Sequence, residues 1–450
     1  MPPSDTAADR NWPSDLSDCL ERLPDVSHWL VALSGGLDST FLLHCLALKA
    51  RQCSAGLSAI HINHGLQPRA DQWAHWCEQQ CRALGVPLIQ EELRLDGTAP
   101  DLEARARQRR YQVFAQHLPA GGVLFMAHHA DDQAETVLLR LMRGSGVRGL
   151  SGMPSTRILG SGILHRPLLP LRRERIEFLA RTWGLDWCED ESNLDTRFDR
   201  NYLRHEIVPR LEARWPAAVA RINRSAEHAG NADRLLDELV QQDEQLCRRG
   251  SGLSVKELAT LPEARRHALV RHRLRALGSP LPGERQLATG LDALLTASSD
   301  RQPELRWQGA HGTLTLRRFR DRLWLVPALE EAQQGSMAWS PDQPLDWFGG
   351  VLESTPVTGQ GLKCPEQGGF TVALRRGGER FRPGCGRPGR SLKKWLQEQR
   401  IPPWERDHMP LIHHGNELVA IADLWCAPHW QAVAGERGFQ LLWRTDSQVL

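Results

Sequence analysis

A serine and two glycines stand where a short apolar run gives way to a helix-like stretch. The segment 31–43 reads VALSGGLDSTFLL. Successive backbone N–H groups in a glycine turn form a concave site for anions, and the N-terminus of the following helix adds a partial positive charge. Gly35 and Gly36 let the backbone approach a phosphate without Cβ clashes, while Ser34 and Ser39 can donate hydroxyl hydrogen bonds to its oxygens. The phosphate-binding residues that we predict are Ser34, Gly35, Gly36, Leu37, Asp38 and Ser39.

Asp38 has no evident use in holding an anion directly. A carboxylate beside a triphosphate is useful when Mg²⁺ bridges the two, and we therefore predict that Asp38 is a magnesium ligand. The G-x-x-x-x-G-K-[ST] pattern of a Walker A loop is absent. The alternative is that this segment only caps a helix that begins with an acid.

A second polar segment, 128–136, follows another apolar run and reads HHADDQAET. Helical spacing puts Asp132, Glu135 and Thr136 on one face. Carboxylates that point into a site need a cation, and either magnesium or an ammonium group would serve. Asp131 has the alternative interpretation of an acid that the helix dipole favours in a first turn.

Basic residues recur at helical spacing in two other places. Arg200, Asn201 and Arg204 share one helical face, and two arginines that flank an amide suit a phosphate or a carboxylate. A second set lies at positions i, i+4 and i+7 of another helix-like stretch: Glu103, Arg107 and Arg110. The alternative for this second set is an exposed intrahelical salt bridge, worth only ~0.3–0.5 kcal/mol.

Alternating strand-like and helix-like patterns surround these residues in the first 210 positions. The apolar runs are 29–34, 57–63, 87–93, 123–129 and 163–169, and the helix-like stretches between them are 37–50, 69–84, 101–118, 131–143 and 172–183. Such alternation predicts an α/β domain whose parallel sheet is covered on both faces. Ligands of these sheets bind beyond the carboxyl ends of the strands, where the glycine turn falls.

The pattern changes after about position 214. Helical periodicity without strands covers 216–247, 256–277 and 284–297, and two β-like runs follow at Thr313–Phe319 and Arg322–Val326. A Gly/Pro/Gln-rich stretch around 328–346 indicates a linker, and the remainder mixes short strands with one helix near 391–400. We predict a catalytic domain over 1–213, a mainly helical domain over 214–330, and a linker with a small α+β domain over 331–450.

Composition places the chain among ordinary globular proteins. It has 41% hydrophobic and 24% charged residues and a formal net charge of +2. No uncharged apolar run reaches the ~18 residues of a membrane helix, and no secretory signal is visible at the N-terminus, so we expect a cytoplasmic protein without a membrane partner. The ten cysteines include no C-x-x-C pair, which argues against a zinc ribbon or a thioredoxin-like site.

A basic segment stands near the C-terminus. Residues 375–407 contain ten lysines and arginines and four acids, a local charge of +6. Trp395 and Trp404 interleave with these charges, and cations combined with stacking surfaces suit structured RNA. The alternative is a solvated charged face. The basic residues are Arg375, Arg376, Arg380, Arg382, Arg387, Arg390, Lys393, Lys394, Arg400 and Arg406.

The S-G-G-x-D-S turn resembles the pyrophosphate loop (PP-loop) of the N-type ATP pyrophosphatases, which cleave ATP between its α and β phosphates. In combination, several segments resemble the tRNA(Ile)-lysidine synthetase family. These are SGGLDS (34–39), HINHGL (61–66), HHADDQAET (128–136), RGSG (143–146), RPLL (166–169) and D-x-S-N…RN-x-x-R (190–204). The segment from Leu392 to Arg406 resembles the C-terminal motif of that family, whose layout also includes a helical substrate-binding domain.

The resemblance implies an ATP-dependent carbon–nitrogen ligase of tRNA processing. ATP would adenylate the C2 oxygen of the wobble cytidine of tRNA(Ile) with anticodon CAU, and the ε-amine of L-lysine would then displace AMP to form lysidine. Asp132 and Glu135 are candidate partners of the lysine ammonium, and either a carboxylate or His128 would remove its proton. The candidate catalytic residues are Asp38, Asp132, Glu135 and His128, and those that would contact lysine or tRNA are Glu103, Arg107, Arg110, Arg200, Asn201, Arg204, Arg390, Lys393 and Lys394.

Two alternatives remain open from the sequence. One is a tRNA thiolase on the same ATP-binding fold, although sulfur transfer usually needs paired reactive cysteines or an iron–sulfur cluster. The other is an RNA-binding protein with an inactive nucleotide site, against which the intact Ser34, Asp38, Ser39 and Asp132 argue.

Overall fold

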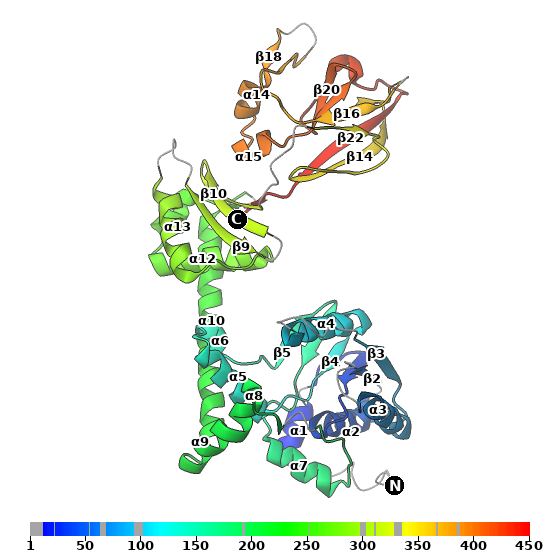
Figure 1. Cartoon of the computed structure of the whole chain (residues 1–450), viewed down its shortest axis with the longest axis vertical. Helices are drawn as coiled ribbons and strands as arrows, with labels where there is room; N and C mark the ends of the chain where they lie inside the picture. Colours follow the sequence, from blue (N-terminus) through cyan, green and yellow to red (C-terminus); the bar gives the residue numbers. More distant parts are fainter. Residues whose placement is uncertain are drawn as a thin grey trace. The chain divides into compact units, whose positions relative to one another are not determined.

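The structure is a computed structural model, which describes residues 12–21, 23–53, 55–63, 69–93, 102–190, 194–250, 252–297, 303–309, 312–327, 335–365, 368–384 and 388–450. The chain forms two compact units, residues 1–236 and 237–450 (Figure 1). The unit boundary lies within one long helix, α10 (Ala218–Cys247). Each unit is described by itself, and the three-domain division stays a prediction.

A six-stranded sheet forms the centre of the first unit. Its order is β3-β2-β1-β4-β6-β5, and all neighbours are parallel except β5 and β6. The strands are β1 (His28–Ala32), β2 (Gly56–Asn63), β3 (Leu88–Glu92), β4 (Val123–Phe125), β5 (Thr156–Leu159) and β6 (Gly162–His165). The five predicted strands are confirmed. The antiparallel edge strand β5 was not predicted: its sequence TRIL has two polar residues followed by two apolar ones, and one of these, Ile158, is 81% exposed.

Side chains of the central strand β1 alternate between two cores. Trp29 and Val31 pack in one core with Phe41 of α2 (Leu37–Cys53), whereas Leu30 packs in the other with Phe114 of α4 (Leu102–His117). This alternation follows from the period of two along a strand, and it confirms a sheet covered on both faces. The crossover helices α3 (Ala70–Leu84) and α5 (Ala130–Met142) also match the prediction.

Shorter helices complete the first unit. They are α1 (Ser14–Glu21), α6 (Val147–Leu150), α7 (Arg173–Thr182), α8 (Asp199–Tyr202) and α9 (Val208–Arg214). A π-helical turn, Leu203–Ile207, joins α8 to α9. π-Helical turns are rare in proteins, and those that do occur are often found at functional sites.

Helices and an antiparallel sheet begin the second unit. The helices are α11 (Val255–Thr260), α12 (Glu263–Ala276) and α13 (Glu284–Thr296), and the sheet contains β9 (Glu304–Gly309), β10 (Gly312–Phe319), β11 (Arg322–Pro327) and β23 (Gln448–Val449). The expected hairpin of β10 and β11 is confirmed. A short antiparallel pair that was not predicted, β7 (Arg248–Arg249) and β8 (Gly252–Leu253), lies between the first two predicted helical stretches. Pro262 divides the predicted helix 256–277 into α11 and α12.

Two further sheets form the rest of this unit. One has the order β12-β16-β19-β20-β21 and the other β13-β14-β22-β15, with β17 and β18 as a separate pair. The strands are β12 (Ser336–Trp339), β13 (Leu345–Trp347), β14 (Gly350–Thr358), β15 (Leu362–Lys363), β16 (Phe370–Ala373), β17 (Arg380–Phe381), β18 (Arg390–Ser391), β19 (Leu411–His414), β20 (Glu417–Ile421), β21 (Trp425–Cys426) and β22 (Arg437–Thr445). The predicted helix near 391–400 is α14 (Leu392–Glu398), followed by α15 (Pro403–Arg406).

The predicted linker is in part a structured segment. Residues 328–334 lie outside the described part, but β12 and the start of β13 fall within 336–346. Trp339 and Trp347 anchor these strands in the core of the C-terminal sheets. Among the described residues, no helix combines the length and apolar character that a membrane span needs.

Candidate active site

The glycine turn between β1 and α2 is held by its own hydrogen bonds. The Ser39 hydroxyl oxygen accepts a hydrogen bond from the Ser34 N–H (3.2 Å) and lies 3.0 Å from the Ser34 hydroxyl oxygen. It also donates to the Gly36 carbonyl (3.1 Å). Gly35 has a φ of +88°, and a Cβ on it would lie 3.2 Å from the Cys77 sulfur. The turn therefore requires glycine for its conformation and its packing, and Ser39 holds its shape, while Ser34 is exposed.

Asp38 presents an unsatisfied carboxylate beside this turn. Its Oδ1 atom is buried and has no hydrogen-bond partner in the described part of the chain. Its Oδ2 atom lies 3.7 Å from His129 Nε2. Burial raises the pKa of Asp38 and outweighs the attraction of His129. A carboxylate oxygen that is removed from water without a donor needs a cation, and Asp38 therefore fits the predicted magnesium ligand.

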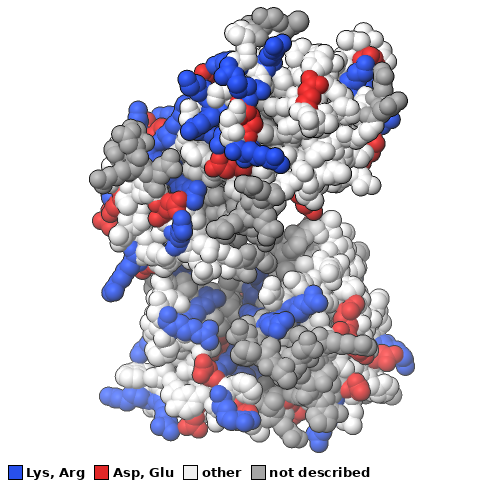
Figure 2. Space-filling model, turned by 45° about the horizontal axis from the view of Figure 1, so that its top comes forward, with Lys and Arg blue, Asp and Glu red and all other residues white. Residues whose placement is uncertain are grey.

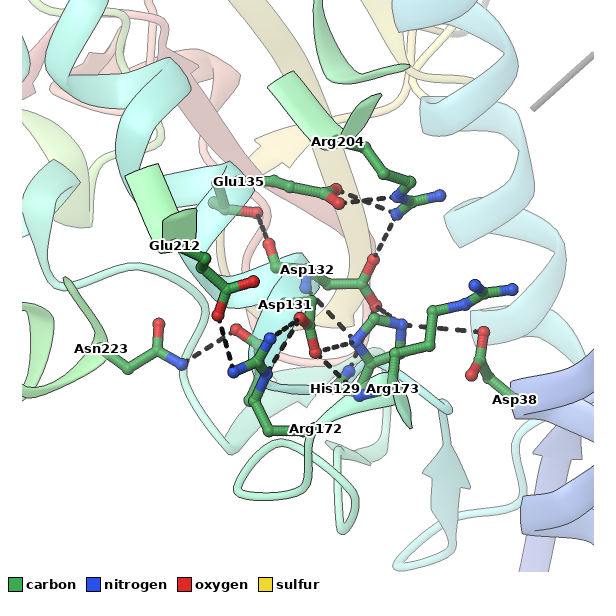
Figure 3. Close-up of polar contacts among 12 residues, drawn as sticks. Asp38, His129, Asp131, Asp132, Glu135, Arg172, Arg173, Arg204, Glu212 and Asn223 are labelled. Atoms are coloured by element: carbon green, nitrogen blue, oxygen red, sulfur yellow. Dashed lines mark hydrogen bonds and ion pairs between the residues drawn. The ribbon is translucent and has the colours of Figure 1, made fainter. Parts of the chain in front are cut away.

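His129 is a functional candidate that the sequence analysis did not single out. Its backbone N–H donates to Asp132 Oδ2 (3.1 Å) in the cap of α5 (Figure 3). Its buried ring faces three carboxylates: Nε2 lies 3.4 Å from Asp132 Oδ2 and 3.7 Å from Asp38 Oδ2, and Nδ1 lies 3.6 Å from Asp131 Oδ2. Burial opposes protonation of this ring, but the carboxylates outweigh it and raise the pKa of His129. The ring thus links Asp38 to the acids of α5.

Asp132 and Glu135 form a network of four ion pairs with Arg200 and Arg204. Arg200 contacts Asp132 Oδ1 and Glu135 Oε2, each at 2.8 Å. Arg204 contacts Asp132 Oδ1 at 3.0 Å and Glu135 Oε1 at 2.7 Å (Figure 3). Burial alone would raise the pKa of Asp132, but His129 and the arginines lower it. In this conformation the cations that these carboxylates require come from the same chain.

The basic residues of the network come from α8 and from the π-helical turn that follows it. Arg200 precedes the turn and Arg204 lies in it, and both side chains reach the acids of α5. The amide of Asn201 instead donates to the Asp195 carbonyl (3.0 Å). Of the three residues predicted to share one helical face, the two arginines point to the same acids, while Asn201 points toward the backbone.

Asp131 serves the local structure. Its carboxylate accepts hydrogen bonds from Arg172 Nε (3.0 Å) and from the Arg173 N–H (2.8 Å), and Arg172 also contacts Glu212 at 2.9 Å. Although burial opposes ionisation, these donors and the His129 ring hold the pKa of Asp131 well below its usual range. This arrangement supports the structural interpretation of Asp131 that the sequence left open.

His128 lies with several arginines at the ends of two neighbouring strands, β4 and β6. Arg166, directly after β6, donates its Nε–H to His128 Nδ1 (3.2 Å). Arg107 is exposed on α4, with its guanidinium 5.5 Å from the centre of the Tyr111 ring. Arg110 is partly buried on the same helix. The side chain of Glu103 and residues 64–68 and 191–193, which include parts of two motifs, lie outside the described residues.

The predicted basic segment belongs to the second unit. Lys393 and Lys394 are exposed on α14, whereas Arg390 pairs with Glu398 at 2.6 Å. Figure 2 shows basic side chains gathered on a face of the C-terminal part of the chain. The predicted stacking surfaces were wrong: Trp395 is buried against Phe381, with ring centres 4.9 Å apart. Trp404 is buried against the two rings Phe319 and Trp324.

Three family models match successive parts of this chain. A PP-loop domain matches residues 11–211, a TilS substrate binding domain matches 253–324, and a TilS substrate C-terminal domain matches 370–443. The chain is 44% identical over 437 residues to the tRNA(Ile)-lysidine synthase of Alkalilimnicola ehrlichii, covering 94% of this chain and 96% of that protein. It is 37% identical over 434 residues to the enzyme of the same name from Coxiella burnetii, covering 95% and 96%. Among solved structures, the U34-tRNA thiolase NcsA from Methanococcus maripaludis is 18% identical, with a TM-score of 0.40 over 48% of this chain and 76% of that chain.

Proposed function

Because this chain belongs to the tRNA(Ile)-lysidine synthase family, we propose that it joins L-lysine to C2 of the wobble cytidine of tRNA(Ile) with anticodon CAU. The chain is an ATP-dependent ligase. The observation that carries the proposal is the buried Asp38 Oδ1, which has no hydrogen-bond partner among the described residues and lies beside the glycine turn after β1. The thiolase alternative has less support, since the relatives that match this chain over nearly its whole length are named tRNA(Ile)-lysidine synthase.

The glycine turn supports the adenylation step. Its backbone N–H groups and the start of α2 provide fixed dipoles for the pyrophosphate that leaves ATP. Asp38 would hold Mg²⁺, which when bound neutralises charge on the phosphates. Ser39 keeps the turn in shape through its bond to Ser34. This chain therefore contributes a preorganised anion site and one metal ligand.

The acids of α5 support the binding of lysine, but their ion pairs with arginine compete with it. Asp132, Glu135, Arg200 and Arg204 sum to zero charge, and every Glu135 oxygen already accepts an arginine hydrogen bond. A lysine ammonium that binds these carboxylates must therefore replace an arginine contact. Arg204 lies in the π-helical turn Leu203–Ile207, and we propose that a shift of this turn releases it when lysine binds.

The second unit supports the binding of tRNA. The relatives and the TilS models point to a tRNA substrate, and the exposed lysines of α14 supply charge without an aromatic platform. We propose that Lys393, Lys394 and Arg390 contact the phosphate backbone of tRNA(Ile). Because its proposed substrate is a tRNA, we propose that the activity is cytoplasmic.

The decisive experiment incubates the protein with ATP, Mg²⁺, labelled lysine and candidate tRNAs that share the CAU anticodon. Lysine should appear in the isoleucine acceptor alone, with AMP released in step. Asp38→Ala should abolish AMP formation while tRNA binding survives, because it removes the metal ligand and leaves the second unit intact. AMP formation without incorporated lysine, or lysine in every CAU tRNA, would contradict the proposal.

A further inference from the structure

His128 and Arg166 form a hydrogen-bonded pair in which only Arg166 can be the donor. Arg166 is 3% exposed, and its Nη1 donates to the Pro154 carbonyl (2.7 Å) while its Nε donates to His128 Nδ1 (3.2 Å). A guanidinium carries donors and no acceptor, and it keeps its charge in proteins. His128 Nδ1 must therefore be the acceptor, so it carries no proton.

The surroundings keep His128 neutral. Burial and the positive charges of Arg166, Arg200 and Arg107 outweigh the attraction of Asp132 and lower the pKa of His128 to about 3. A neutral imidazole carries one proton, which is on Nε2 when Nδ1 accepts. Among the described residues Nε2 has no hydrogen-bond partner, and the residue His128 is partly exposed.

The same surroundings select the kind of atom that Nε2 would contact. Arg107 and Arg157 lie over the Tyr111 ring at 5.5 Å and 4.4 Å. Arg166 makes no ion pair with a described carboxylate. Burial would raise the pKa of Tyr111, but the arginines lower it, which indicates a strongly positive local field. Such a field favours an anionic oxygen and opposes a cation.

We propose that Arg166 is a positioning residue that fixes His128 as the Nε2–H tautomer, so that His128 donates a hydrogen bond to a phosphate oxygen of the reacting nucleotide. This inference rests on the proposed function and deepens it. A donor at this position stabilises negative charge on ATP or on the AMP that leaves. Removal of the lysine proton then falls to a group other than His128.

The tautomer is tested directly by ¹⁵N NMR of the full chain with labelled histidine. The His128 signals are assigned from the difference between wild type and His128→Gln. We expect a bare Nδ1 and a protonated Nε2 from pH 6 to pH 8, and a mixture of tautomers in Arg166→Gln. A proton on Nδ1 in the wild type, or on both nitrogens at pH 6.5, would overturn the proposal. This spectrum needs no turnover, so it stands even if lysidine formation is not observed.

Activity separates a donor from a base. Loss of a donor to developing charge lowers the rate about 100-fold, and we expect this of His128→Ala. His128→Gln should be about tenfold faster than His128→Ala, because the glutamine amide N–H can replace Nε2–H. The dependence of its rate on pH should show the same rising and falling limbs as the wild type. His75→Gln, at a side chain that is 66% exposed, is the control and should be unchanged. Equal loss in the alanine and glutamine variants, or a limb missing from His128→Gln, would refute a donor role.

Discussion

At the scale of single residues, Glu135 is the residue on which the site network most depends. The residue is 1% exposed; its Oε1 accepts from Arg204, and its Oε2 accepts from both Arg200 and Arg204. Removing one partner of a buried ion pair leaves uncompensated charge. We expect Glu135→Gln to lower the free energy of unfolding by about 2–4 kcal/mol, measured by urea unfolding with tryptophan fluorescence, and to weaken lysine binding.

Glu177→Gln is the matched control for this change. Glu177 pairs with Arg181 at 2.8 Å, one turn away on the exposed face of α7. Exposed pairs of this kind contribute less than about 1 kcal/mol. If both variants lost the same stability, the Glu135 network would have no special energetic role.

At the scale of elements, α15 contains a partly buried carboxylate, Glu405, whose ionised form is disfavoured by burial. Burial raises the pKa of Glu405 from 4.5 to about 7, although the Thr445 hydroxyl donates to it (3.3 Å). The folded state thus binds a proton that the unfolded state releases, so stability is full below pH 4.5 and falls as the pH rises to about 7. We expect Glu405→Gln to stabilise the protein by about 1–3 kcal/mol at pH 8 and to have little effect at pH 4.5.

Thermal unfolding of the two proteins across this pH range tests the sign. Asp423→Asn, an equivalent change at an exposed position of the same unit, should leave the curve unchanged. A Glu405→Gln variant that is less stable at pH 8 would mean that the ionised carboxylate has a stabilising partner.

At the scale of the whole molecule, RNA binding should depend on charges that the fold leaves unpaired. Lys393→Ala with Lys394→Ala should weaken tRNA binding and reduce the slope of log K against log salt by about 1–2, since each lysine lost removes about one phosphate contact. The rate of ATP-dependent AMP formation at saturating tRNA should not change. Filter binding at several salt concentrations measures the slope.

Lys363→Ala with Arg437→Ala is the matched control in the same unit. These residues already pair with Glu436 and Asp342, each at 3.1 Å. The control should leave the slope unchanged. An unchanged slope in the Lys393 and Lys394 variant would instead remove α14 from the RNA interface.

Some parts of the site could be predicted because they are encoded in neighbouring residues. The SGGLDS turn follows an apolar strand and opens a helix, and its shape depends on Gly35 and on the bond between Ser34 and Ser39, which are five positions apart. The alternation of strands and helices likewise predicted the parallel sheet and the edge on which the site lies. In each case the determining contacts are local or follow from a regular period.

Other features depended on contacts between distant segments. Asp132 and Glu135 were predicted to need a cation, and Arg200 and Arg204 to need an anion, but spacing along the chain cannot show that they satisfy each other across 65 to 72 positions. The same limit applies to Trp395 and Trp404, whose burial depends on Phe381, Phe319 and Trp324. The sequence by itself determined the turn, the sheet and the charges available. Only the tertiary structure decided which charges neutralise one another and which remain for a substrate, because long-range packing sets both the distances and the burial on which their energies depend.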